Sequence, residues 1–268
     1  MKRDRKPELM APAGNLEKLK AAIDFGADAV YLGGHDFSLR AMARNFSLSE
    51  IKEGLQIAHR LGRRVYVTVN IFAHNQDIDR LPTYLVELNE LGVDGLIISD
   101  PGVLLLAKEF SPDLPVIIST QANVTNFQSA EFYRRQGVSR LVLARELSIE
   151  EIARIKRTVP IELEVFIHGA MCLSYSGRCW LSQAMTGRSA NRGECAHPCR
   201  YLYALQEEKR PGQFYPVAED ERGSYVMNSK DLCMIRFIPQ LMEAGVDAFK
   251  IEGRMKSPYY VAAVVKVY

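Results

Sequence analysis

The residues whose types and spacing most clearly suggest chemistry are cysteines. Four of the five in the chain lie in one stretch that is rich in glycine, serine, arginine and asparagine: Cys172, Cys179, Cys195 and Cys199. Such a stretch cannot form a packed core strand, so burial in the core does not explain these thiols. Cysteine thiolates bind zinc and iron–sulfur clusters. The cluster therefore predicts a metal-binding site.

The spacing of the four cysteines bears on which cofactor they hold. Zinc ribbons use close pairs of cysteines, and only Cys195 and Cys199 form such a pair. Iron–sulfur clusters accept more varied spacing, so the pattern favours iron–sulfur, with zinc as the alternative. Cys233 is the alternative fourth ligand. We predict Cys199 instead, because its own backbone holds it close to Cys195.

Composition limits the class of protein. The chain has 268 residues, 47% of them hydrophobic, and a net charge of +2. This is enough for one large domain, and it lacks the basic character of a dedicated DNA-binding domain. Neither a signal peptide nor an apolar run long enough to span a membrane is present in the sequence. We therefore expect a cytoplasmic protein with no membrane association, in which thiols stay reduced.

The elements that position the cysteines form a strand–helix repeat. Apolar or β-branched runs recur eight times, and most precede a segment with helical periodicity, which predicts a (β/α)8 TIM-barrel-like α/β fold. An open doubly wound sheet is the alternative, but no strand leads into a GxGxxG loop. The predicted strands are Glu8–Ala13, Ala29–Gly33, Arg64–Ile71, Gly95–Ser99, Pro115–Gln121, Arg140–Ala144, Ile161–Ile167 and Ala248–Glu252. The predicted helices are Leu16–Phe25, Ser49–Leu61, Ile78–Leu91, Gly102–Phe110, Phe127–Gln136 and Ile149–Thr158.

One connection is much longer than the others. The segment 169–247, between the seventh and eighth strands, carries all five cysteines and is predicted to be an insertion in a single barrel domain spanning 1–268. Its middle alternates apolar and polar residues, which predicts a small antiparallel excursion. A helix over Lys230–Ala244 should return the chain to the barrel. A last helix starts at Ser257 and Pro258, and we expect the chain to be truncated before a further C-terminal region.

Active sites of such barrels lie at the carboxyl ends of the strands, and polar residues follow almost every predicted strand. They are Tyr31, His35, Asn70, His74, Asp100, Gln121, Asn123, Arg145, Glu146, His168, Glu252, Arg254 and Lys256. Of these we predict that His168, Glu252 and Asn123 are catalytic. We predict that Arg145, Arg254, Lys256, Gln121 and Asn70 bind substrate, together with Arg40 from the second βα loop and with Arg44 beside it. The cationic groups suit an anionic ligand such as a carboxylate or phosphate.

Several motifs resemble the signature of the collagenase-like peptidase family of unclassified mechanism. They are the segments Glu164–Ser182, Asn191–Arg200, Asn228–Leu232, Lys250–Ser257 and Glu8–Gly14. The family name implies a peptidase, for which Cys172 and His168 would be the candidate dyad. The sequence has no HExxH or GxSxG motif to support proteolysis.

The resemblance also implies other chemistry. Branches of this family perform oxygen-independent hydroxylation with a 4Fe-4S cluster on four cysteines, acting on a tRNA wobble uridine, a 23S rRNA cytidine or the ubiquinone ring. The motifs here look most like the tRNA branch, for which prephenate is the implied hydroxyl donor. The quinone branch requires a paired homologue as partner. For a tRNA substrate, Arg188, Arg192 and Arg200 would track phosphates or form a solvated loop face, and Tyr175 and Trp180 would stack on bases or pack the insertion.

Overall fold

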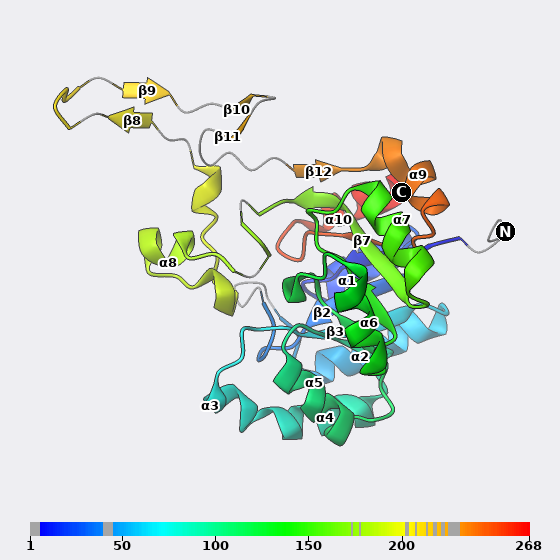
Figure 1. Cartoon of the computed structure of the whole chain (residues 1–268). Helices are drawn as coiled ribbons and strands as arrows, with labels where there is room; N and C mark the ends of the chain where they lie inside the picture. Colours follow the sequence, from blue (N-terminus) through cyan, green and yellow to red (C-terminus); the bar gives the residue numbers. More distant parts are fainter. Residues whose placement is uncertain are drawn as a thin grey trace.

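The computed structural model describes residues 6–39, 45–172, 174–176, 178–201, 204–206, 208–212, 214–216, 219–220, 223–224 and 231–268. Eight parallel strands form a closed barrel, because β6 pairs with β7 and joins the two ends of the sheet order (Figure 1). These strands are β1 (Glu8–Pro12), β2 (Ala29–Gly33), β3 (Arg64–Val69), β4 (Gly95–Ile98), β5 (Val116–Ile118), β6 (Arg140–Val142), β7 (Glu162–Ala170) and β13 (Ala248–Ile251). The predicted TIM-barrel-like fold is confirmed.

Helices between the strands cover the outside of the barrel. They are α1 (Leu16–Asp24), α2 (Leu48–Arg60), α3 (Asn75–Ile78), α4 (Leu81–Leu91), α5 (Pro101–Phe110), α6 (Phe127–Arg135), α7 (Ile149–Thr158), α9 (Ile238–Glu243) and α10 (Pro258–Val267). Side chains cap several of them: Ser47 and Ser148 form capping boxes with a glutamate three residues on. Ser257 likewise caps α10, and Pro258 is the first residue of that helix.

Three predicted elements differ from the structure. The helix predicted over Ile78–Leu91 begins later, as α4 at Leu81, after the separate short helix α3 that ends at Ile78; Pro82 lies in the first turn of α4, where its missing N–H costs no hydrogen bond. The fifth strand ends at Ile118, and a 3-10 turn, η1 (Thr120–Ala122), follows it. The helix predicted from Lys230 was placed too early: β12 (Asp231–Cys233) pairs antiparallel with β7, then η4 (Ile235–Phe237) and α9 follow.

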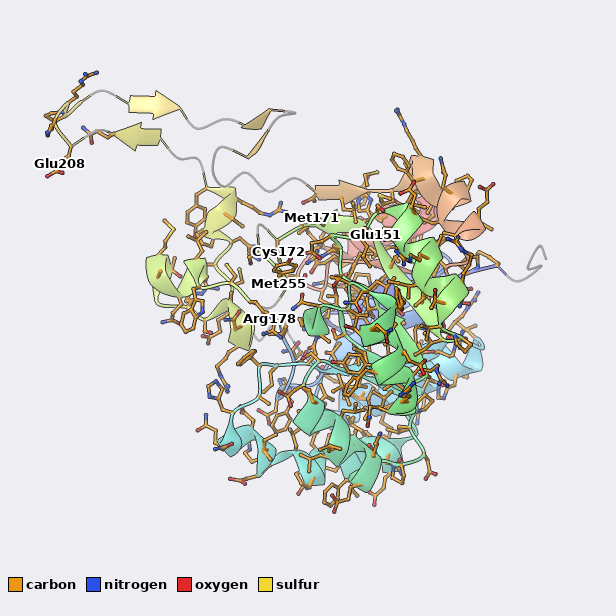
Figure 2. All side chains as sticks on the ribbon, in the orientation of Figure 1. Glu151, Met171, Cys172, Arg178, Glu208 and Met255 are labelled. Carbon is orange, nitrogen blue, oxygen red and sulfur yellow. The ribbon has the colours of Figure 1, made fainter. Side chains whose placement is uncertain are left out.

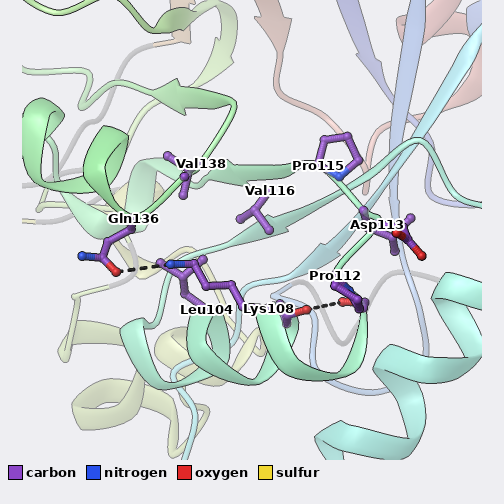
Figure 3. Close-up of a pocket in the computed structure, with 12 residues that line it drawn as sticks. Leu104, Lys108, Pro112, Asp113, Pro115, Val116, Gln136 and Val138 are labelled. Atoms are coloured by element: carbon purple, nitrogen blue, oxygen red, sulfur yellow. Dashed lines mark hydrogen bonds between the residues drawn. The ribbon is translucent and has the colours of Figure 1, made fainter.

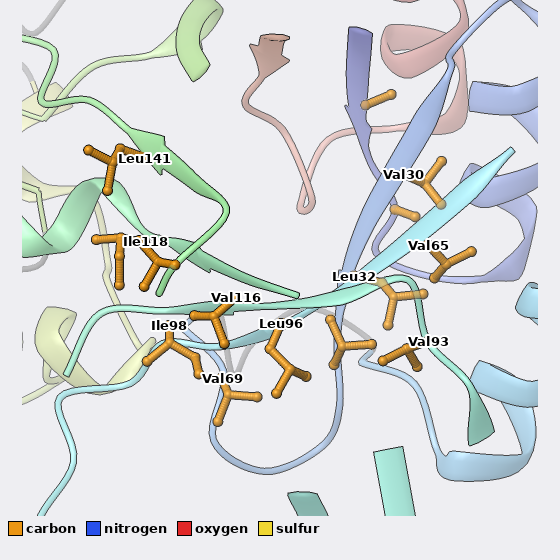
Figure 4. Packing of buried hydrophobic residues seen from close by; sticks show 14 of the residues in the cluster. Val30, Leu32, Val65, Val69, Val93, Leu96, Ile98, Val116, Ile118 and Leu141 are labelled. Carbon is orange, nitrogen blue, oxygen red and sulfur yellow. The ribbon is translucent and has the colours of Figure 1, made fainter. Parts of the chain in front are cut away.

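The hydrophobic core has two layers. The larger one fills the space between the barrel and its helices and includes Val30, Leu96 and Ile118 (Figure 4). The smaller one lies inside the barrel and contains Met10, Ala29, Tyr31, Tyr66, Ile97, Ile117 and Val142, with Phe166 packed against it. Alternate strand residues point to opposite faces, so each strand contributes to both layers.

The interior also holds charged groups. Arg140 lies over the Tyr66 ring and donates to Glu8 and Glu164, while Lys250 lies over the Tyr31 ring and donates to Glu164 at 2.7 Å. All four charged side chains are at least nine-tenths buried. Burial of charge is tolerated here because each group has an opposite partner and hydrogen bonds.

The insertion between β7 and β13 forms small elements. They are α8 (Leu181–Thr186), η2 (Ala190–Arg192), η3 (Pro198–Arg200), the antiparallel pair β8 (Ala204–Gln206) and β9 (Phe214–Pro216), and the antiparallel pair β10 (Glu219–Asp220) and β11 (Gly223–Ser224). The predicted antiparallel excursion is therefore present, and Figure 1 shows the β8–β9 pair standing away from the barrel. Among the described residues, every helix is too short or too polar to cross a membrane.

A pocket of about 240 Å³ lies beside α5, where the chain enters β5 and β6 (Figure 3). Lys108, Asp113 and Gln136 line it, and Lys108 Nζ donates to Gln136 Oε1 at 3.3 Å. It faces the amino ends of the strands. The carboxyl ends, where barrel enzymes carry their active sites, are at the other side.

Candidate active site at the barrel mouth

The four clustered cysteines are all free thiols, and they influence one another electrostatically. Burial raises the pKa of the Cys199 thiol, and the neighbouring Cys195, Cys172 and Cys179 raise it further, while Arg200 opposes them. Charges act on each other in this way only at short range. The other three thiols therefore lie within electrostatic range of Cys199, in the segment that follows the carboxyl end of β7.

Cys233 has different surroundings. It is the last residue of β12, it is exposed, and its Sγ lies 3.8 Å from the Tyr268 hydroxyl. Four thiolates are the donor set that an iron–sulfur cluster takes, and the choice of Cys199 as the fourth ligand stays a prediction. Within the described residues, no three Cys, His, Asp or Glu side chains already stand at metal-binding spacing.

Arg145 connects β6 to the cysteine loop. Its Nη1 donates to the Ala170 carbonyl at 2.8 Å, and its Nη2 contacts the Ser176 hydroxyl and lies 3.6 Å from Cys172 Sγ. The guanidinium also stacks over the Phe166 ring, with 5.2 Å between Arg145 Cζ and the ring centroid. Arg145 therefore holds the loop and provides positive charge beside Cys172.

The insertion is fastened to the barrel on its other side. Asn191 Oδ1 accepts from the Cys179 N–H at 3.0 Å, and the Asn191 carbonyl accepts from the Phe72 N–H at 3.3 Å. Arg192 forms a two-pronged pair with Asp77, at 3.0 and 3.2 Å, and these hydrogen bonds hold the pKa of Asp77 below its usual value. Figure 2 labels Cys172 and Arg178 on this segment.

Arginines predicted to track phosphates are therefore partly used within the protein. Arg192 binds Asp77, and Arg200 pairs with Asp231 at 2.8 Å. Arg188 is half-buried, whereas Tyr175 and Trp180 are exposed, with 55% and 74% of their surface accessible. Of the predicted RNA-contacting residues, these two aromatic side chains face solvent.

The predicted amides at the ends of β3 and β5 lie together. Asn70 Nδ2 donates to Gln121 Oε1 at 3.3 Å and lies 3.4 Å from the Ser119 hydroxyl, which also contacts Gln121 Oε1. Asn123 follows η1 in the left-handed conformation, with φ of 54°, which Asn tolerates better than most residues. Its Nδ2 donates to the Gln121 carbonyl at 3.1 Å.

The segment after β13 places its charges at different depths. Arg254 is buried, and its Nη1 donates to the Ser38 and Thr68 hydroxyls at 2.8 and 3.0 Å. A Cβ at Gly33 would lie 2.2 Å from this nitrogen, so a glycine is required for the approach. Lys256 lies over the Tyr260 ring, and the Glu252 carbonyl accepts from the Tyr260 hydroxyl. Arg40 and Arg44 lie outside the described residues.

His168 faces the last helix. Its Nδ1 lies 3.3 Å from the Tyr268 hydroxyl, and its ring packs against those of Tyr260 and Tyr268. Burial lowers the pKa of His168, which favours the neutral imidazole. No hydrogen bond joins it to Cys172, although both residues are described, so the structure does not form the dyad that a cysteine peptidase would use.

Other predicted residues have local roles. Asp100 caps α5 by accepting from the Gly102 and Val103 N–H groups, and the buried Tyr31 hydroxyl donates to the Ile251 carbonyl. The sequence did not single out Asp77, Ser119 or Lys250. Lys250 had a signal: a lysine within an otherwise apolar buried strand needs a charged partner.

The comparisons with known proteins agree with this architecture. The model of peptidase family U32 matches residues 14–268. A Bacillus subtilis protein named tRNA hydroxylation protein P1 is 47% identical over 98% of this chain, which spans 62% of that relative. An Escherichia coli 23S rRNA 5-hydroxycytidine C2501 synthase is 38% identical over 97% of this chain, and the matched region makes up 38% of that relative's length.

A solved structure of a U32 peptidase shares the fold. It superposes with a TM-score of 0.59 over 94% of this chain and 95% of that one, at 17% identity. The family match, the close relatives and the shared barrel lead to one conclusion. This chain belongs to peptidase family U32.

Proposed function

We propose that this chain is the barrel of an RNA-modifying enzyme that converts a tRNA wobble uridine to 5-hydroxyuridine. The relative that is 47% identical is named for tRNA hydroxylation. The chain spans about three fifths of the first relative, so the activity of the whole protein is part of this proposal. A tRNA substrate also agrees with the expected cytoplasmic location.

We further propose that Cys172, Cys179, Cys195 and Cys199 hold a 4Fe-4S cluster. The observation that carries this is the presence of four free thiols in the segment after β7, with Arg145 Nη2 3.6 Å from Cys172 Sγ. When bound, such a cluster supplies redox chemistry beside the substrate without a need for oxygen. Zinc is the alternative occupant.

The residues of this chain would bind and orient the reactants. Arg254 and Lys256 supply positive charge at the end of β13 for a dicarboxylate hydroxyl donor such as prephenate. Arg145 keeps the cysteine loop against β7 through the Ala170 carbonyl. The exposed Tyr175 and Trp180 provide stacking surfaces for unpaired bases, and Arg188 provides charge for phosphates.

The cluster is tested by anaerobic purification followed by iron and acid-labile sulfide analysis and a visible spectrum. We expect iron and sulfide in the wild-type protein and in Cys233→Ser, and their loss in Cys199→Ser. The Cys233→Ser variant is the matched control, because that thiol contacts Tyr268 outside the cluster. A colourless, iron-free wild-type protein that retains activity would contradict the proposal.

The substrate is tested by nucleoside mass spectrometry of tRNA from a deletion strain. Supplying the protein should restore 5-hydroxyuridine and its derivatives, and Cys172→Ser should not. A requirement for a paired homologue would appear as restoration only when a second family member is supplied. Unchanged tRNA nucleosides in the deletion strain, together with gelatin cleavage that depends on Cys172, would favour the peptidase instead.

A further inference from the structure

Two side-chain amides after β5 have hydrogen-bonding groups that none of the described residues uses. Gln121 lies in η1 and Asn123 directly follows this turn. Thr120 Oγ1 donates to the Leu143 carbonyl at 3.1 Å, and the Ala144 N–H donates to the Val124 carbonyl at 3.2 Å. The turn is thus bonded to the segment that continues into Arg145, which contacts Cys172. The amides therefore belong to the mouth that carries the cysteines.

Backbone groups fix the orientation of the Gln121 amide. The Leu39 N–H donates at 3.1 Å to Asn70 Oδ1, so Asn70 must present its Nδ2 to Gln121. An NH₂ group requires an acceptor, which makes the contacting atom of Gln121 its Oε1. The opposite end of the Gln121 amide is therefore its Nε2 group, which forms no hydrogen bond with the described residues.

The Asn123 amide is fixed in the same way. Its Nδ2 donates to the backbone carbonyl of Gln121 at 3.1 Å, and a carbonyl can only accept. Asn123 Oδ1 is then the free end. It is buried, and none of the described residues donates to it. A buried acceptor without a donor is costly, and a ligand that brings a donor removes that cost.

We propose that Gln121 Nε2 and Asn123 Oδ1 together read the Watson–Crick edge of the target uracil. That edge has one donor, N3–H, with a carbonyl acceptor on each side. Asn123 Oδ1 accepts from N3–H, and Gln121 Nε2 donates to an adjacent carbonyl, as enzymes that act on extruded bases do. Cytosine has no hydrogen on N3, so in this orientation two acceptors would face each other. The inference rests on the proposed function, which supplies the uridine.

Two variants separate this role from a structural one. Asn123→Gly removes the acceptor and keeps a residue that tolerates φ of 54°. Gln121→Glu keeps the oxygen that Ser119 and Asn70 contact and replaces the donor with an acceptor. Gln136→Glu is the matched control, because Gln136 lines the pocket at the amino ends of the strands.

The probes are two anticodon stem-loop RNAs, with uridine or N3-methyluridine at the target position, titrated into anaerobically prepared protein and followed by fluorescence anisotropy. The wild-type protein and Gln136→Glu should bind the uridine RNA about tenfold more tightly than the N3-methyluridine RNA. Asn123→Gly should bind both RNAs equally. Gln121→Glu should lose about tenfold affinity for the uridine RNA. The uridine preference is a ratio within one variant, so a change in folded fraction cancels from it; the Gln121→Glu affinity is compared with that of Gln136→Glu at equal concentration of folded protein.

The proposed recognition of uracil is contradicted if Asn123→Gly keeps the full preference for the uridine RNA, or if the wild-type protein has no preference. The proposed function fails separately, when the wild-type protein produces no 5-hydroxyuridine in tRNA. If the wild-type protein hydroxylates tRNA but Asn123→Gly keeps its preference for uridine, the proposed uracil recognition is wrong and the proposed function is retained.

Discussion

Gly169 shows how one residue sets the geometry of the mouth. It precedes the cysteine loop with φ of 110°, and a Cβ there would lie 2.9 Å from both the Cβ and the carbonyl oxygen of Glu252. The neighbouring His168 carbonyl accepts from the Glu252 N–H at 2.9 Å. The close approach of β7 to the end of β13 therefore requires a residue without a side chain, and Glu252 and the cysteine loop both depend on it.

We predict that Gly169→Ala destabilises the protein by about 1–3 kcal/mol, because it adds steric contact to an unfavourable φ. Gly137→Ala is the matched control: its φ is 72°, and nothing lies within 4 Å of the added Cβ. It should cost about 1 kcal/mol. Urea unfolding of both variants measures their losses of stability. Equal losses would contradict the prediction, because they would mean that a shift of the backbone relieves the contact with Glu252.

Among the elements, the cysteine-bearing part of the insertion, 171–201, is attached to the barrel on two sides. On one side Arg145 binds the chain at Ala170 and Ser176, and on the other Arg192 binds Asp77 in α3. The second attachment is electrostatic and therefore responds to pH. Asp77 has its pKa lowered by the hydrogen bonds from Arg192. The Arg192–Asp77 pair therefore stabilises the attachment of the insertion at pH values above 3.8, the ordinary aspartate pKa. This stabilisation is lost as the pH falls through the lower pKa that Asp77 has in the folded protein.

We predict that the only tryptophan, Trp180 at the start of α8, reports this attachment. Its fluorescence anisotropy in the wild-type protein should stay constant near neutral pH and fall below about pH 4 as Asp77 is protonated. Asp77→Asn should show the lower anisotropy already at pH 7. Asp79→Asn, which changes an exposed neighbour, should behave as the wild type. Superimposable curves for all three proteins would mean that the ion pair does not hold the insertion.

The whole molecule is organised around a barrel whose interior contains an ion network. Glu164 is fully buried, and although burial alone would raise its pKa, Lys250 and Arg140 hold the pKa below its usual value. Lys250 comes from β13, Arg140 from β6 and Glu164 from β7, which lies between them. The network thus links the strands that carry Arg145, the cysteine insertion and Arg254.

We predict that Glu164→Gln destabilises the protein by about 3 kcal/mol, because two buried cations lose their shared carboxylate. Glu162→Gln removes another Arg140 partner, but that carboxylate is 42% exposed, so the loss should be at most about 1 kcal/mol. Adding Lys250→Met to Glu164→Gln should cost less than the sum of the two changes. Urea unfolding checks the wild type, the three single variants Glu164→Gln, Glu162→Gln and Lys250→Met, and the double variant; a Glu164→Gln loss as small as that of Glu162→Gln would contradict the network's importance.

The sequence by itself determined the strand–helix repeat, most helix starts and the cysteine cluster. Continuous apolar runs, serine caps and cysteines in a glycine-rich stretch are local patterns, so they can be read without a fold. Local patterns also misled: the signal for a helix from Lys230 did not reveal that Asp231–Cys233 would pair with β7, because strand pairing depends on a distant partner.

Only the tertiary structure decided how the mouth residues pair. Arg192 binds Asp77 and His168 meets Tyr268 across 100 or more positions of sequence, and no local pattern encodes such contacts. The free ends of Gln121 and Asn123 are fixed by backbone groups, among them the Leu39 N–H from another loop. Side-chain chemistry is written in the sequence, but which group is left to bind a ligand depends on which partners the closed barrel brings within hydrogen-bonding distance.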